Sequence, residues 1–110
     1  MSSTTLTHVS ALSRLGHALS DDTRTGILLA LRDGPARPSE LARDLGVSKQ
    51  VMSNQLACLR GCGLVVTTAE GRNIWYTLAD PRLEHALGDL LELTLTMDPD
   101  CCSESGCTCT

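Results

Sequence analysis

Apolar residues recur at every third or fourth position along much of the chain, which is the spacing of one face of an α-helix. The pattern predicts a first helix over 9–19. It predicts a second helix that begins after Ser20, carries two acidic residues in its first turn beside the positive end of the helix dipole, and ends at Gly34-Pro35. The chain is therefore expected to open with two amphipathic helices.

A short helix, a glycine turn and another helix are predicted next. Pro38 begins the short helix, Gly46 ends it, and Ser48 begins the following helix. This order is typical of the helix-turn-helix, in which the second helix enters the major groove of DNA. We predict this second helix over 48–61. Its inward side is predicted to consist of Val51, Met52, Leu56 and Leu59.

A β-hairpin follows the predicted helix-turn-helix. Residues 64–68 and 73–78 are rich in β-prone side chains, and residues 69–72 between them read as a hairpin turn. A hairpin directly after a recognition helix is a wing, and a last helix is predicted over 81–96. The predicted fold is therefore mainly α with a β-hairpin wing, a winged helix-turn-helix.

The last predicted helix carries too many apolar residues for one small domain to cover. They extend well beyond a single face of the helix. We therefore expect a homodimer through the first and last helices. The apolar residues concerned are Leu83, Ala86, Leu87, Leu90, Leu91, Leu93 and Leu95.

The length of 110 residues suits a single domain. We expect a flexible N-terminus over 1–7, a DNA-binding and dimerisation domain over 8–97, and a flexible Cys-rich tail over 98–110. No apolar run approaches the roughly 18 residues of a membrane span, and no secretory signal is visible. The expected location is therefore the cytoplasm, without a membrane partner.

The charge distribution is compatible with a DNA-binding middle segment. Residues 32–72 hold six basic and four acidic side chains, whereas residues 80–110 hold one basic and seven acidic ones. Aromatic residues are limited to Trp75 and Tyr76, which argues against the modules that stack nucleic-acid bases on aromatic platforms. The residues expected to contact DNA are Ser48, Lys49, Gln50, Ser53, Asn54 and Gln55 at the start of the second helix, and Arg72 at the hairpin tip.

Two cysteines lie one helical turn apart in the predicted recognition helix. Cys58 and Cys62 share a helix face at i and i+4, which suits two thiolates on one tetrahedral ion and does not suit a disulfide. A buried cysteine is also a common small apolar side chain, so the spacing alone leaves both interpretations open.

Four further cysteines lie in the polar tail, at Cys101, Cys102, Cys107 and Cys109. A polar segment has no packing need for them, so we expect one or two to complete the site that Cys58 and Cys62 begin. All-thiolate sites favour soft or borderline ions such as Cd(II), Pb(II), Zn(II), Hg(II) or As(III). An ion at the far end of the recognition helix would couple metal sensing to DNA binding.

Other function classes are weaker alternatives. A thiol-redox switch usually has Cys-x-x-Cys beside a βαβ unit, and this chain has Cys-x-x-x-Cys and no parallel-sheet pattern. A metal-storage protein or metallochaperone would leave the helix-turn-helix without a role. No phosphate-binding loop or catalytic constellation is visible, so we expect no enzyme.

Several segments resemble the ArsR/SmtB family of winged-helix metal-sensing repressors. They are ALSDDTRTGIL at 18–28, ELARDLGVSKQVMSNQLACL at 40–59 and EGR at 70–72. The resemblance covers about 10–97. The Cys-Val-Cys motif of other branches is absent, because Leu-Ala-Arg stands at 41–43.

The resemblance implies a dimeric repressor that occupies its operator without metal and dissociates when metal binds, so that a metal resistance or efflux operon is expressed. A dimeric helix-turn-helix is itself expected to read an inverted repeat. CLRGCGLVV at 58–66 is similar to a cadmium- and lead-sensing branch whose ligands are two cysteines of the recognition helix and one of the tail. This implies Cys58 and Cys62 as ligands, Cys102 as the third, and Cys101 as the next candidate. A repressor that responds to As(III) or Sb(III) on the same scaffold is the alternative.

Overall fold

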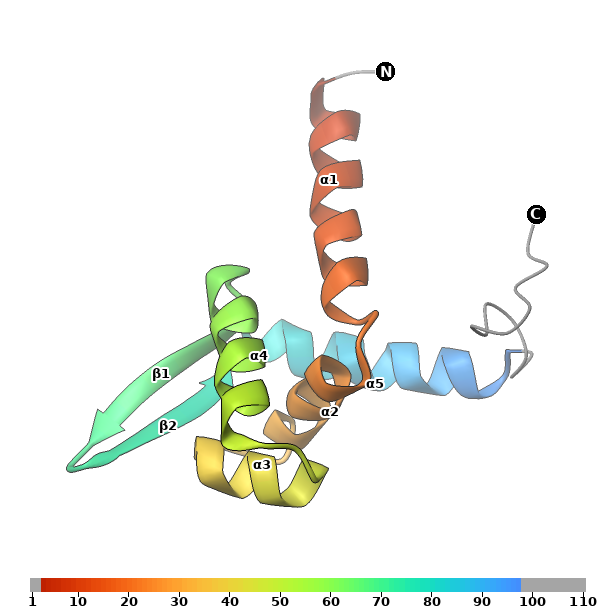
Figure 1. Cartoon of the computed structure of the whole chain (residues 1–110). Helices are drawn as coiled ribbons and strands as arrows, with labels where there is room; N and C mark the ends of the chain where they lie inside the picture. Colours follow the sequence, from red (N-terminus) through yellow and green to blue (C-terminus); the bar gives the residue numbers. More distant parts are fainter. Residues whose placement is uncertain (1–2, 98–110) are drawn as a thin grey trace. The chain divides into compact units, whose positions relative to one another are not determined.

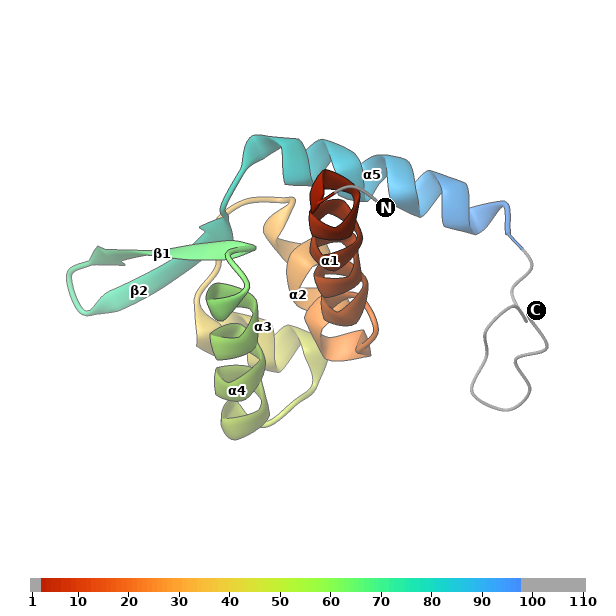
Figure 2. The ribbon, with the colours of Figure 1, turned by 90° about the horizontal axis from the view of Figure 1, so that it is seen from above.

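The computed structural model describes residues 3–97, which form five helices and one two-stranded sheet (Figure 1). The chain divides into two compact units with a boundary between Asp80 and Pro81. The first unit contains helices α1 to α4 and the hairpin, and the second contains helix α5. Within the first unit, the hairpin extends away from the group formed by α2, α3 and α4 (Figure 2).

Helix α1 spans Ser3–Ala18 and is longer than the sequence pattern predicted. The prediction of a helix from residue 9 relied on apolar periodicity, which the Ser- and Thr-rich start lacks. The helix nevertheless extends to Ser3, because residues 3–8 contain no glycine or proline to end it. Helix α1 therefore begins within the segment 1–7 that the sequence analysis assigned to the N-terminus.

Helix α2 spans Asp22–Leu31 and begins one residue later than predicted. Its N-cap is Asp21, whose carboxylate accepts a hydrogen bond of 3.0 Å from the backbone N–H of Arg24. Ser20, the predicted cap, instead donates its hydroxyl to the carbonyl oxygen of His17 at 2.6 Å. Both residues are good caps by type, so their order in the sequence could not decide which of them would fill the position.

The helix-turn-helix is confirmed. Helix α3 spans Pro38–Leu45, and Gly46 ends it in the left-handed conformation with φ of 67°. Helix α4 spans Lys49–Gly61 and has Ser48 as its N-cap, with the hydroxyl accepting from the N–H of Val51 at 3.1 Å. Local turn and cap chemistry thus fixes the start of the helix that carries most of the predicted DNA contacts.

The core of the first unit lies where helices α2, α3 and α4 meet the base of the hairpin. Met52, Leu56 and Leu59 follow one another at i, i+4 and i+7 on α4, and all three are buried. Val51 was predicted to face inward, but it is 39% exposed. It lies one residue, and so about 100°, around the helix from Met52, which turns its side chain out of the core.

The wing is a two-residue hairpin. Strand β1 (Val65–Glu70) pairs antiparallel with β2 (Asn73–Leu78), and the last pair is Glu70 with Asn73. The turn is therefore shorter than the four-residue turn predicted over 69–72. Gly71 makes this possible because it adopts a φ of 63°. Backbone hydrogen bonds between Ala36 and Tyr76, of 2.8 and 3.1 Å, attach the hairpin to the segment before α3.

The second unit contains α5, which spans Pro81–Leu95. Leu87 is buried, whereas Leu90, Leu91, Leu93 and Leu95 are exposed. The helix therefore presents the broad apolar surface that the sequence predicted. Among the helices of residues 3–97, none is both long enough and apolar enough to cross a membrane.

Candidate nucleic-acid interface and cysteine site

The start of helix α4 presents a polar surface. Ser48, Lys49, Gln50, Ser53 and Asn54 are all exposed there. The amide of Gln50 donates to the side-chain oxygen of Asn54 at 3.0 Å, so the two amides hold each other in place one turn apart. Small hydroxyls, paired amides and a lysine are side chains that can meet base edges and phosphates.

Gln55 differs from the other residues predicted to contact DNA. Its side chain is half-buried, and its Oε1 accepts a hydrogen bond of 3.0 Å from Nη1 of Arg24 in helix α2. Sequence reasoning grouped it with its exposed neighbours, because nothing in the local pattern shows a partner 31 residues away.

Arg72 lies at the tip of the wing, where it is exposed. It follows Gly71 in the two-residue turn, so the hairpin carries its positive charge away from α2, α3 and α4 of the same unit (Figure 1). This position suits contact with a phosphate or with a minor groove beside the major groove that α4 would occupy.

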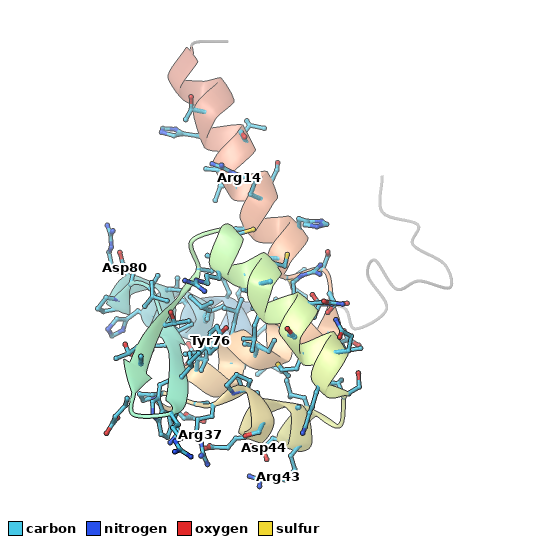
Figure 3. The ribbon with its side chains drawn as sticks, turned by 60° about the vertical axis from the view of Figure 1, so that its left-hand side comes forward. Arg14, Arg37, Arg43, Asp44, Tyr76 and Asp80 are labelled. Carbon is cyan, nitrogen blue, oxygen red and sulfur yellow. The ribbon has the colours of Figure 1, made fainter. Side chains whose placement is uncertain are left out.

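Arg37 is a cationic residue near the helix-turn-helix that the sequence analysis did not single out. Its guanidinium lies over the ring of Trp75, 5.4 Å from the centroid, and its Nε is 2.6 Å from Oε1 of Glu40. Figure 3 labels Arg37 at the end of the first unit where α3 lies. The i, i+3 spacing of Arg37 and Glu40 was visible in the sequence, but the stacking on Trp75 depends on the fold.

Cys58 and Cys62 lie at the opposite end of α4 from its polar start. Cys58 is half-buried in the last turns, and Cys62 is the exposed C-cap, whose backbone N–H donates to the carbonyl oxygen of Cys58 at 3.0 Å. The helical i, i+4 relation is therefore kept, and both thiols are free. The donor set suits a soft ion.

Two thiols do not complete a metal site. Within residues 3–97, no group of three or more His, Cys, Asp or Glu side chains is placed to hold an ion. Cys101 and Cys102, the predicted further ligands, lie outside the described residues, as do Cys107 and Cys109.

A small cavity of about 160 Å³ lies beside Cys62. It is lined by Cys62 and Leu64 at the end of α4 and by Ala11, Arg14 and Leu15 of α1. The middle of α1 therefore lines the same cavity as Cys62, and Figure 3 labels Arg14 on that helix.

The comparisons with known proteins agree with this arrangement. Residues 21–67 match the family described as "Bacterial regulatory protein, arsR family". The chain is 55% identical over 91 residues to the HTH-type transcriptional regulator CmtR from Mycobacterium tuberculosis, a match that covers 83% of this chain and 77% of that protein. It is 31% identical over 101 residues to a probable mercury resistance operon repressor from Streptomyces lividans, covering 88% and 79% respectively.

The fold has a similar solved relative. The NMR structure of the cadmium metal-sensor CmtR from Mycobacterium tuberculosis superposes with a TM-score of 0.66 at 52% identity, covering 84% of this chain and 98% of that one. Together with the helix-turn-helix and the wing, these matches show that the chain belongs to the arsR family of bacterial regulatory proteins, whose members are transcriptional regulators and not enzymes.

Proposed function

We propose that this protein is a cytoplasmic, metal-responsive repressor. Without metal it binds operator DNA as a dimer, and it dissociates when Cd(II) or Pb(II) binds its cysteine thiolates, so that a metal resistance or efflux operon is expressed. One observation carries the proposal. The same rigid helix, α4, presents exposed polar side chains at its start and two free thiols one turn apart at its end.

The DNA-binding part of the proposal rests on exposure and chemistry. Ser48, Lys49, Gln50, Ser53 and Asn54 of α4 would meet the major groove, and Arg72 of the wing would meet a phosphate or the minor groove. The operator would be an inverted repeat with half-sites roughly 34–36 Å apart, or a multiple of that distance.

The metal-binding part rests on the donor set. Cys58 and Cys62 supply two thiolates, Cys102 is the proposed third ligand, and Cys101 is the next candidate. Thiolate sites favour soft ions. Two relatives are named for such ions, one as a cadmium metal-sensor and one as a probable mercury resistance operon repressor. We therefore place Cd(II) and Pb(II) first among the inducers, ahead of As(III), Sb(III), Zn(II) and Hg(II).

The dimer would form through α1 and α5. Val9 and Leu12 of α1 are exposed, at 52% and 69%, as are Leu93 and Leu95 of α5, at 58% and 77%. Apolar surface of this extent on two helices is typical of a subunit interface.

The decisive experiment is a titration of the full-length protein on a fluorescent operator duplex. Without metal, two chains are expected to bind each inverted repeat. Cd(II) or Pb(II) is expected to weaken binding by about 5–150-fold, the usual allosteric range. If operator affinity is unchanged by metal, the proposal is wrong. If As(III) releases the protein at lower concentration than Cd(II) and Pb(II) do, the proposed inducers are wrong.

Arg37 is expected to contact the DNA backbone. The Nε of Arg37 is bound to the carboxylate of Glu40, and the face of its guanidinium lies over the ring of Trp75. The terminal nitrogens of the guanidinium are therefore the atoms that would meet a phosphate. Arg37→Ala should weaken binding to specific and non-specific duplexes alike. It should also reduce the slope of log K against log salt by about one, the change expected for one lost phosphate contact. An unchanged slope would show that Arg37 does not touch the backbone, and Arg37→Lys should retain most of it.

A further inference from the structure

Arg24 connects three helices of the first unit through its guanidinium. Nε donates to the carbonyl oxygen of Ala18 at 3.1 Å, and Nη2 donates to that of His17 at 3.0 Å, both in the last turn of α1. Nη1 donates to Oε1 of Gln55 in α4 at 3.0 Å. Arg24 itself belongs to the first turn of α2, where the N-cap Asp21 holds its backbone.

This arrangement is stiff for chemical reasons. The last carbonyl groups of a helix lack partners within the helix and carry the negative end of its dipole, so a cation that donates to them is favourably placed. A guanidinium is planar, and its N–H groups point in fixed directions. When Arg24 is bound to the end of α1, the direction of its remaining Nη1 donor is therefore fixed as well, and with it the place that Gln55 can occupy.

Gln55 lies on the same stripe of α4 as the two thiols. Gln55, Cys58 and Cys62 are related by i, i+3 and i+7, the spacing of one helix face. At one end of this stripe Gln55 reaches the last turn of α1 through Arg24. At the other end Cys62 shares a cavity with Ala11 and Arg14, about one to two turns earlier in α1. The stripe that carries the thiols is thus linked to the last turn of α1 through Arg24, and its Cys62 end shares a cavity with the middle of α1.

We propose that Arg24 is a positioning residue which fastens α4 to α1 through Gln55, and that this fastening converts ligation at Cys58 and Cys62 into a change at the DNA-reading start of α4. The inference rests on the proposed function. It gives Gln55 a role in positioning the recognition helix in place of the base contact expected from the sequence. If α4 is held at Gln55, a displacement of its thiol end on metal binding also displaces its DNA-reading start. Without the bond to Arg24, the thiol end can move while the start stays in place.

The test measures a coupling ratio, defined as the operator Kd with Cd(II) divided by the Kd without it. Arg24→Ala and Gln55→Ala should each lower this ratio toward one. The double variant should lower it no further than either single variant, because both remove the same hydrogen bond. Arg43→Ala is the matched control, since Arg43 is a largely exposed arginine whose Nε lies 3.6 Å from Oδ1 of the adjacent Asp44. It should keep the wild-type ratio.

A second readout separates fastening from stability and from metal binding. Cd(II) affinity without DNA, read from thiolate-to-metal absorption, should be unchanged in the Gln55→Ala variant, because the ligands are intact. The Gln55→Ala variant is also expected to stay folded, because Gln55 is only half-buried and the hydrogen bonds of Arg24 to α1 remain in place.

Gln55→Glu distinguishes the two roles of this residue. Glutamate keeps the acceptor oxygen and the length of the side chain, so Arg24 should still hold it, and both operator affinity and the coupling ratio should survive. If Gln55 reads a base through its amide, the carboxylate should lower operator affinity by at least about fivefold, and the inference is then overturned. It is also overturned if wild-type protein is released by Cd(II) and Arg24→Ala is released equally. If wild-type protein is not released at all, the proposed function fails first.

Discussion

A Cys58→Ser/Cys62→Ser variant is expected to remain on its operator at Cd(II) or Pb(II) concentrations that release the wild-type protein. A hydroxyl is a poor ligand for soft ions, so the substitution removes both donors that α4 supplies while changing one atom in each side chain. The whole allosteric effect of about 1–3 kcal/mol should disappear, since residues 3–97 contain no group of three or more His, Cys, Asp or Glu side chains that could hold an ion instead. Operator affinity without metal should stay near the wild-type value, because the exposed polar residues at the start of α4 are untouched.

Fluorescence anisotropy of an operator duplex, with and without metal, measures this effect directly. Ala57→Ser is the matched control, because it places a serine at an exposed position of the same helix and leaves both thiols in place. It should respond to metal as the wild type does. Cys102→Ser should give a weaker form of the double variant's defect, and Cys101→Ser a weaker one still. Release of the double variant by Cd(II) at wild-type concentrations would remove Cys58 and Cys62 from the proposed site.

The helix-turn-helix could be predicted from the sequence because local chemistry fixes it. Pro38 starts a helix, Gly46 ends it in a backbone conformation that glycine adopts easily, and Ser48 caps the next one. Each signal acts within a few residues of its own position. Where two adjacent residues offered the same chemistry, as Ser20 and Asp21 did before α2, the sequence could not rank them.

The contacts that organise the candidate site are not local, and the sequence pattern does not contain them. Arg24 and Gln55 are 31 residues apart, and Arg37 meets Trp75 across the junction between the wing and the segment before α3. Arg24 meets Gln55, and Arg37 meets Trp75, only after the helices and the hairpin have packed. Periodicity could place Gln55 in the first half of α4, but it could not show that this side chain meets Arg24 of α2.

Leu59→Ala is expected to be among the most damaging single changes to stability in the first unit. Leu59 is 0% exposed, belongs to the buried side of α4 with Met52 and Leu56, and lies between Cys58 and Cys62 in the sequence. Truncation removes its packing and leaves a cavity, which costs about 2–5 kcal/mol for a buried leucine. Because small domains are stable by only about 5–15 kcal/mol, this is a large fraction of the total. Thermal unfolding at fixed protein concentration should show a Tm lowered by more than about 10 °C.

Val51→Ala is the matched control, because it truncates another branched apolar residue of α4 at a position that is 39% exposed. Its effect on the free energy of unfolding should be within about 1 kcal/mol, since little packing is lost and alanine favours the helix. If the two variants lost equal stability, the result would indicate that Val51 packs inward, as the sequence predicted, and not at the surface. Leu59→Ala should also keep its coupling ratio where it remains folded, because Arg24 and Gln55 are intact. Lower stability with a preserved coupling ratio would show that the coupling depends on the Arg24–Gln55 hydrogen bond and not on the core packing of α4.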